Sequence, residues 1–213
     1  MGQVVRGINT TVEVQASLDT AKTISAITKA SPAQVTSAAH GYANGDVIVL
    51  TVQGMVQLNG VAARVANVAA NTFDLEGVDS SAFGTFTSGS CQKVATWNTF
   101  DSLTAVSLPN AAPAELDQTT IHDSSLQTTY GLPGAPTGTM SGQFNPLSTA
   151  VANLRAATLN GQNRAFRMTF ETGLKAVFNS TPAAGQGFDL SVNAIGTATY
   201  NLTVRGFVNF YAS

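Results

Sequence analysis

The sequence contains few charged residues, a single cysteine and only two histidines. Lysine, arginine, aspartate and glutamate make up 10% of its 213 residues, whereas about 25% is usual in soluble globular domains. Most of the surface must therefore be neutral, built from Thr, Ser, Asn, Gln, Gly and Ala. Because Cys91 has no second cysteine to pair with inside the chain, the fold cannot depend on an internal disulfide or on an oxidising compartment.

The same scarcity argues against a catalytic or metal site. A zinc site needs three or four closely spaced nitrogen or sulfur ligands, and this chain offers only His40, Cys91 and His122. No Gly-x-Ser-x-Gly motif marks a nucleophilic serine, and the glycine-rich stretch 131–142 lacks the lysine of a phosphate-binding loop. The acidic group within 74–79 is sparser than a calcium-binding loop requires. We therefore expect no enzyme, no metal and no cofactor.

Other absences concern membranes and nucleic acids. The chain has no run of the roughly 20 apolar residues that cross a bilayer, and the stretch MGQVVRGINTT lacks the apolar centre of a secretion signal. The ten basic residues are dispersed, whereas a protein that reads nucleic-acid sequence needs a basic cluster or face. We expect no membrane association, no secretion and no sequence-specific contact with nucleic acid.

Residues 28–95 have the pattern of a small all-β unit. Five short apolar runs follow one another at a spacing of roughly ten residues, which is typical of a small barrel or sandwich. Turn residues such as Asn44-Gly45 and Asn59-Gly60 separate the runs, and Asn and Gly tolerate the positive φ that tight turns need. The segment is close to neutral, so it offers no strong charge to attract an ionic ligand.

The C-terminal half predicts one helix packed on antiparallel strands. Asn145 and Pro146 are typical of a helix start, and Asn160-Gly161 is typical of a helix end. The stripe that we expect to pack against the sheet consists of Leu147, Val151 and Leu154. Apolar residues then alternate with polar ones in three stretches predicted as strands, at about residues 164–170, 187–195 and 199–210.

From residue 97 onward the order of elements resembles the major tail tube proteins of long-tailed phages. The resemblance rests on "LTAVSLP", the segment 110–137, "GTMSGQF", the helix, "RAFRMTFETGLKAVFN" and the closing strand that ends in "VRGFVNF". It implies a mainly β fold, an antiparallel sandwich or barrel with one packed helix, made by residues 1–27 and 96–213. The barrel of residues 28–95 would then be an insertion in a surface loop, where insertions are well tolerated.

The resemblance also implies a function. Such proteins form hexameric rings that stack into the virion's tail tube, the conduit for genome ejection, and they assemble in the host cytoplasm. The implied partners are other copies of the chain, tape measure, tail terminator and distal tail proteins, and passing double-stranded DNA. A wall without basic clusters lets DNA slide. The candidate lumen face consists of neutral polar side chains, namely Ser191, Asn193, Thr199, Asn201 and Thr203.

Residues 110–137 are predicted to be a long loop that connects one ring to the next. The segment holds three prolines and no regular apolar period, and loops of that length are usually functional. Its apolar side chains would be a liability if they were exposed to water. Docked on a neighbouring ring, these side chains would be buried as inter-ring contacts. The residues that we expect to make these contacts are Leu116, Ile121, Leu126, Tyr130 and Leu132.

The inserted barrel resembles the first catalytic-cysteine half-domain of ubiquitin-activating enzymes. The resemblance rests on the stretch that begins "HGYANGDVIVLTVQGM" and ends near Gly89. That half-domain does not hold the enzymes' catalytic cysteine, and Cys91 lies at the far edge of the segment. The resemblance therefore implies no transfer chemistry in this chain.

A rival hypothesis is a secreted or surface β-sandwich that binds carbohydrate through the small barrel. Trp97, Tyr42 and the Thr- and Asn-rich surface favour it. The lack of a secretion signal and of an aromatic cluster argues against it, and nothing favours an enzyme of another kind. Imaging separates the hypotheses, because a tube protein gives rings or tubes and the others give dispersed monomers.

Overall fold

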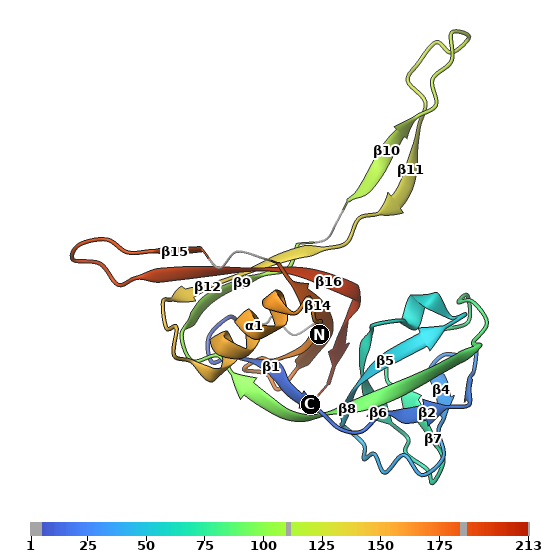
Figure 1. The fold of residues 1–213 in the computed structure, drawn as a ribbon. Helices are drawn as coiled ribbons and strands as arrows, with labels where there is room; N and C mark the ends of the chain where they lie inside the picture. The colour runs from blue at the N-terminus through green and yellow to red at the C-terminus, as the bar shows by residue number, and fades with distance from the viewer. Residues whose placement is uncertain (1–5, 110–111, 184–186, 213) are drawn as a thin grey trace.

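The computed structural model describes residues 6–109, 112–183 and 187–212 of the chain. Over these residues the fold is mainly antiparallel β with one α-helix (Figure 1), so the predicted fold class is confirmed. In chain order the elements are β1 (Thr11–Leu18), β2 (Lys22–Ile24), β3 (Ala26–Ile27), β4 (Ala33–Thr36), β5 (Val47–Gln53), the 3-10 turn η1 (Val56–Leu58), β6 (Ala62–Ala66), β7 (Thr72–Leu75), β8 (Ser88–Thr99), β9 (Leu103–Ser107), β10 (Pro113–Asp117), β11 (Thr128–Pro133), β12 (Thr137–Gln143), α1 (Thr149–Leu159), β13 (Arg164–Thr169), β14 (Lys175–Pro182), β15 (Gly187–Asp189) and β16 (Thr197–Tyr211).

Strands β2 to β7 and the first half of β8 form a small barrel. The strand order is β3-β4-β7-β6-β5-β8, and β2 returns to pair with β8. Because only Ser25 separates β2 from β3, the two short strands act as one and close the barrel. Gly45 and Gly60 have φ of 91° and 76° in its turns, a region that L side chains rarely adopt. Both β2 and β3 precede residue 28, the boundary expected from the sequence.

The barrel has its own apolar core. It gathers the inward residues of every barrel strand, among them Val35, Ile48, Leu50, Phe73 and Leu75, all buried. The period-two alternation of β4 and of the end of β5 explains this arrangement, since successive side chains of a strand point to opposite faces.

The rest of the chain is a curled sheet that wraps around α1. The strand order continues from β8 through β1-β13-β14-β16-β12-β9, and Figure 1 shows α1 lying between β1 and the β16–β12 side of the sheet. Val151 and Leu154 of α1 are buried in a second core together with strand residues from β1, β12, β13, β14 and β16. The dry side of the curled sheet therefore faces the helix.

The helix is shorter than predicted, and Leu147 does not belong to its packed stripe. Ser148 is the N-cap residue, because Pro146 and Leu147 form a turn that the Ser148 N–H closes by donating to the Asn145 carbonyl. Leu147 is 91% exposed. The predicted end is confirmed, since the helix stops at Leu159 and Gly161 follows with φ of 61°.

Two further predictions were wrong. The segment predicted as a long loop over residues 110–137 contains a two-stranded hairpin instead, and its residues 110–111 lie outside the described part of the chain. Strands β10 and β11 form this hairpin, named the arm below, which projects from the body (Figure 1). The strand expected over residues 187–195 ends at Asp189, and the turn that follows leads into β16. Leu190 and Val192, expected on a dry face, are exposed, and none of the described layers of the fold covers them.

The barrel and the curled sheet share one long strand and a third apolar cluster. Residues 88–93 of β8 pair with β5, and residues 94–99 pair with β1. Val94, Ala165, Val177 and Tyr211 pack together with Val47 and Ala62 of the barrel. The barrel is therefore held against the curled sheet by buried contacts.

Candidate assembly surfaces

The arm is a hairpin with two chemically different faces. Its register places Glu115 opposite Tyr130 and Leu116 opposite Thr129. Since directly opposed residues of an antiparallel pair share a face, one face carries a carboxylate beside an aromatic ring and the other carries Leu116. Tyr130 is 65% exposed.

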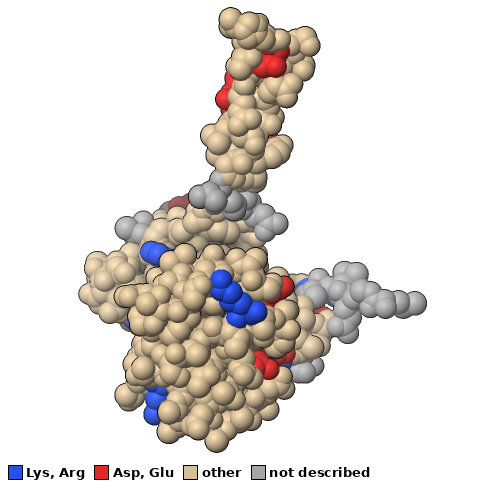
Figure 2. All heavy atoms as spheres, turned by 90° about the vertical axis from the view of Figure 1, so that its right-hand side faces the viewer, with Lys and Arg blue, Asp and Glu red and all other residues tan. Residues whose placement is uncertain are grey.

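The arm is apolar and acidic at once. Leu116, Ile121 and Leu126 are exposed to solvent, and Leu132 lies in β11 with a side chain outside the described residues. Acidic side chains stand out in red on the arm in Figure 2, and the sequence has no Lys or Arg between Lys93 and Arg155. Hydrogen bonds from Thr119 lower the pKa of Asp117, so its carboxylate stays charged at neutral pH.

The outward face of β12 and of the first half of β16 is neutral and polar. Thr199 and Asn201 of β16 are exposed and Thr203 is half-buried. The register pairs these three residues with Ser141, Thr139 and Thr137 of β12, and no charged residue belongs to this set. Ser191 and Asn193, predicted on the same face, lie instead in the turn of the β15–β16 hairpin.

The β15–β16 hairpin is a second projecting element (Figure 1). It exposes Phe188, Leu190, Val192 and Ile195. Asn193 has φ of 64° in its turn, a conformation that Asn tolerates better than most residues. The surface therefore carries two apolar hairpins, one of which the sequence had placed in the core.

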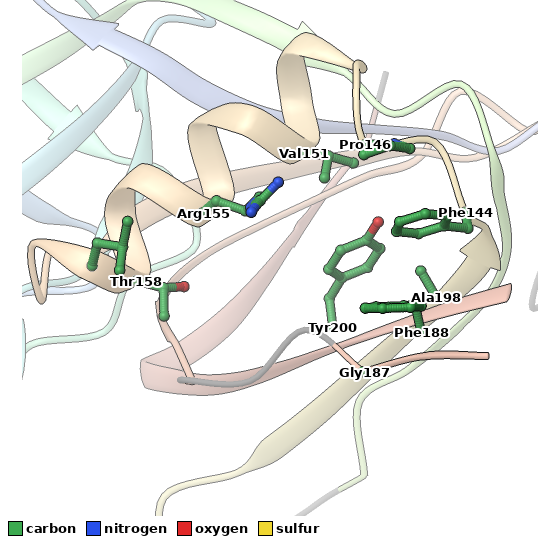
Figure 3. A pocket seen from close by; sticks show the side chains of 10 residues that line it. Phe144, Pro146, Val151, Arg155, Thr158, Gly187, Phe188, Ala198 and Tyr200 are labelled. Atoms are coloured by element: carbon green, nitrogen blue, oxygen red, sulfur yellow. The ribbon is translucent and has the colours of Figure 1, made fainter. Parts of the chain in front are cut away.

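A groove separates α1 from the base of this second hairpin (Figure 3). It has a volume of about 300 Å³, and its lining is mostly apolar: Phe144, Pro146, Val151, Arg155, Thr158, Leu159, Gly187, Phe188, Ala198 and Tyr200. The rings of Phe144 and Phe188 stack with centroids 4.9 Å apart. Arg155 extends from α1 toward the space that Tyr200 lines (Figure 3).

Sequence reasoning missed this groove. Arg155 follows Val151 by four residues, which places both on one side of a helix, and that spacing was a usable signal. The partner residues Phe144 and Phe188 come from segments whose meeting depends on the hairpin. Burial raises the pKa of Tyr200, and the nearby positive charge of Arg155 acts in the opposite direction.

Polar contacts attach the barrel to β14 and β16. The Asn179 side-chain amide donates to the Gly60 carbonyl at 2.7 Å, and the Arg64 N–H donates to the Tyr211 hydroxyl at 3.0 Å. The Arg64 guanidinium lies 4.9 Å from the centre of the Tyr211 ring and also pairs with Glu76. Burial raises the pKa of Tyr211 to about 12.

The residues considered for catalysis serve the barrel core instead. His40 Nδ1 accepts the Tyr42 N–H at 3.0 Å, and Nε2 lies 3.0 Å from the Ala69 carbonyl, an arrangement that fits a neutral ring with its proton on Nε2. The Tyr42 hydroxyl donates to the Cys91 carbonyl, and burial raises the pKa of the Cys91 thiol. Among the described residues, no three His, Cys, Asp or Glu side chains form a group able to hold a metal ion.

His122 and Trp97, the other residues weighed from the sequence, do not belong to that core. His122 is exposed in the turn of the arm, and Trp97 is half-buried in β8, where the Arg167 guanidinium lies 4.6 Å from the centre of its indole ring. Within the described part of the chain, no helix is both long enough and apolar enough to cross a membrane.

Comparison with known proteins finds one family. A family model described as phage tail tube protein matches residues 53–213. No curated protein matches the sequence. Among solved structures, the tail of an empty gene transfer agent particle, refined with C6 symmetry, is 15% identical with a TM-score of 0.43, over 55% of this chain and 87% of that one. The SPP1 tail tube is 12% identical with a TM-score of 0.43, over 56% of this chain and 71% of that one.

Proposed function

Because this chain belongs to the phage tail tube protein family and is a structural protein of the virion tail, we propose how its parts build the tube. Copies of the chain close into rings, six to a ring as the family resemblance implies, and the rings stack into a hollow tube. Joining curled sheets side by side also removes the open edge at β9, the last strand of the sheet.

The observation that carries this proposal is the neutral outward face that β12 and the first half of β16 form together. Its paired side chains on β12 and β16 are Thr, Ser and Asn, whereas the opposite face is packed against α1. The electrostatic part of phosphate binding comes from Lys and Arg, and the paired set on β12 and β16 contains neither. Arg205, the next outward residue of β16, hydrogen-bonds to the Thr181 hydroxyl. Thr199, Asn201 and Thr203 would line the channel, with Ser191 and Asn193 near its rim on the hairpin turn.

The arm is the proposed connection between rings. Within the described part of the chain, its side chains Leu116, Ile121, Leu126 and Tyr130 stay exposed to solvent, so burial on the next ring would stabilise the stack. Leu132 belongs to the same proposed set by sequence. At the base of the hairpin, Pro113 and Pro133 pair with each other, and prolines lower the entropy lost when the arm docks.

The small barrel is proposed to sit on the outside of the tube as a decoration. Residues 28–95 supply most of it, and β2 and β3 add residues 22–27. The rest of the expected wall segments, 1–27 and 96–213, supply the wall. Its resemblance to the ubiquitin-activating half-domain stays a prediction. Barrel density inside the wall of an assembled tube would contradict this arrangement.

The remaining partners follow from the same proposal. Tape measure, tail terminator and distal tail proteins would meet the tube along its channel or at its ends, and double-stranded DNA would pass through without sequence-specific binding. Assembly would take place in the host cytoplasm. We assign no catalytic role to the chain.

Deleting residues 116–132 tests the connecting role of the arm. The expected product has a cooperative melt and a normal circular dichroism spectrum, forms single rings and forms no long tubes by negative-stain electron microscopy. Ile121→Ser is a milder variant at a position that is 96% exposed, and Val56→Ser, on the barrel and 67% exposed, is its matched control. Tubes of normal length from the deletion variant would refute the connecting role.

A further inference from the structure

We propose that the groove between α1 and the β15–β16 hairpin receives the Glu115–Tyr130 face of the arm from a second copy of the chain, and that Arg155 pairs there with Glu115. The inference rests on the proposed stacking of rings and names the surface on which the arm docks. It commits to one occupant, the arm of another copy.

The groove has the chemistry needed to receive an aromatic side chain. Phe144, Phe188 and Tyr200 supply ring surfaces, and Val151 and Leu159 supply aliphatic ones. Phe188 is 61% exposed and Leu159 is 86% exposed, so both would lose contact with water on docking. A volume of about 300 Å³ lies at the lower end of ligand pockets and suits one large side chain rather than an extended ligand.

The arm presents a matching side chain. Tyr130 is exposed on a face that also carries Glu115. Opposed residues of an antiparallel pair have Cβ atoms about 5 Å apart, so an aromatic ring and a carboxylate are offered together. Tyr is favoured at interfaces because it buries a large apolar ring while its hydroxyl can stay hydrogen-bonded.

Charge selects the arm over other occupants. Across the described residues, the ion pairs are Arg64–Glu76, Lys93–Asp46 and Arg167–Glu13, so Arg155 has no carboxylate within pairing distance in that part of the chain. The arm carries three carboxylates and no cation between residues 113 and 133. The β15–β16 turn, residues 190–196, has no charged residue at all and could not neutralise Arg155.

The geometry favours docking between copies. The arm points away from the body that holds the groove (Figure 1), and arm and groove are different surfaces. A contact between two different patches is heterologous, and it propagates from copy to copy instead of closing a pair. Such a contact suits a stack of rings.

Charge reversal tests the pair in the full-length chain. Arg155→Glu and Glu115→Arg should each lower the fraction of protein that sediments as tubes by about tenfold or more, which corresponds to ~1.4 kcal/mol. The double variant should restore tubes. Lys29→Glu, an exposed lysine on the barrel, is the control for net charge and should assemble normally. Tubes from both single variants, or no rescue in the double variant, would overturn the proposal.

Disulfide trapping gives a second readout that does not depend on tube length. Tyr130→Cys combined with Leu159→Cys should yield a ladder of covalent multimers under oxidising conditions, since each chain offers both partners and Cys91 is buried. Val192→Cys with Leu159→Cys tests the hairpin turn as the alternative occupant. A ladder from that pair and none from the first would overturn the proposal. Absence of tubes from the unmodified protein would instead refute the proposed function itself.

Discussion

Gly206 lies where the long strand β16 passes close to Val61 of the barrel, and Gly206→Ala is the substitution that probes this contact. Gly206 has φ of 72°, where an L residue costs roughly 1–2 kcal/mol. A Cβ built there would lie 2.7 Å from Cγ2 of Val61, far inside the normal contact distance of about 3.5–4.0 Å. Val61 is fully buried, so it has little room to move.

The expected loss for Gly206→Ala is about 2–4 kcal/mol. Overpacking adds roughly 1–3 kcal/mol to the backbone strain. The lower conformational entropy of the unfolded alanine variant offsets about 0.4–1 kcal/mol of this loss. Gly161→Ala is the matched control, because Gly161 has φ of 61° but nothing within 4 Å of the added Cβ. It should lose only about 1 kcal/mol.

Thermal melts of the unassembled protein measure both variants. A loss of 1 kcal/mol lowers Tm by about 2–4 °C in a chain of this size, so Gly206→Ala should melt about 4–16 °C below the parent. Gly161→Ala should fall by no more than about 4 °C. Equal shifts in the two variants would refute the close packing of the barrel on β16.

Two other predictions concern the helix and the barrel attachment. Leu154→Ala should lower the free energy of unfolding by about 2–5 kcal/mol, because the Leu154 side chain is 1% exposed. Leu147→Ala should change it by less than about 0.5 kcal/mol. Similar urea midpoints for the two variants would contradict the assigned packing. Burial raises the pKa of Tyr211 from 10.0 to about 12. The neutral hydroxyl therefore contributes roughly 2–3 kcal/mol to the free energy of unfolding below pH 10, and this contribution is lost as the pH rises toward 12. Tyr211→Phe should weaken that alkaline loss in urea melts while lowering stability at neutral pH, and an unchanged alkaline profile would contradict the role of the buried hydroxyl.

The local sequence pattern predicted those features that depend on a single helix or strand. The barrel strands follow from short apolar runs between Gly turns, and Val151 and Leu154 follow from helical spacing, because burial of one face leaves a period in the sequence. The helix start was wrong by a few residues: Asn145 uses its side chain on Asp101, and Leu147 falls in the turn before the helix. Nothing in the local pattern separates an apolar residue in that turn from one inside the helix.

Surfaces were harder to predict than cores. The alternation of Phe188, Leu190 and Val192 predicts a strand with a buried face, yet the structure leaves these side chains exposed. In the arm, β10 is exposed along its whole length, and a hairpin that buries no face leaves no apolar period in the sequence from which it could be predicted. The helical spacing of Val151 and Arg155 pointed to one wall of the groove. The other wall, with Phe144 and Phe188, comes from segments that only the folded hairpin brings together.

Electron microscopy of the purified full-length protein tests the central claim most directly. The account predicts stacked rings or tubes with an open channel, with the small barrels on the outer surface and the neutral β12–β16 face toward the channel. A preparation that is folded and concentrated, yet contains only dispersed monomers, would contradict it.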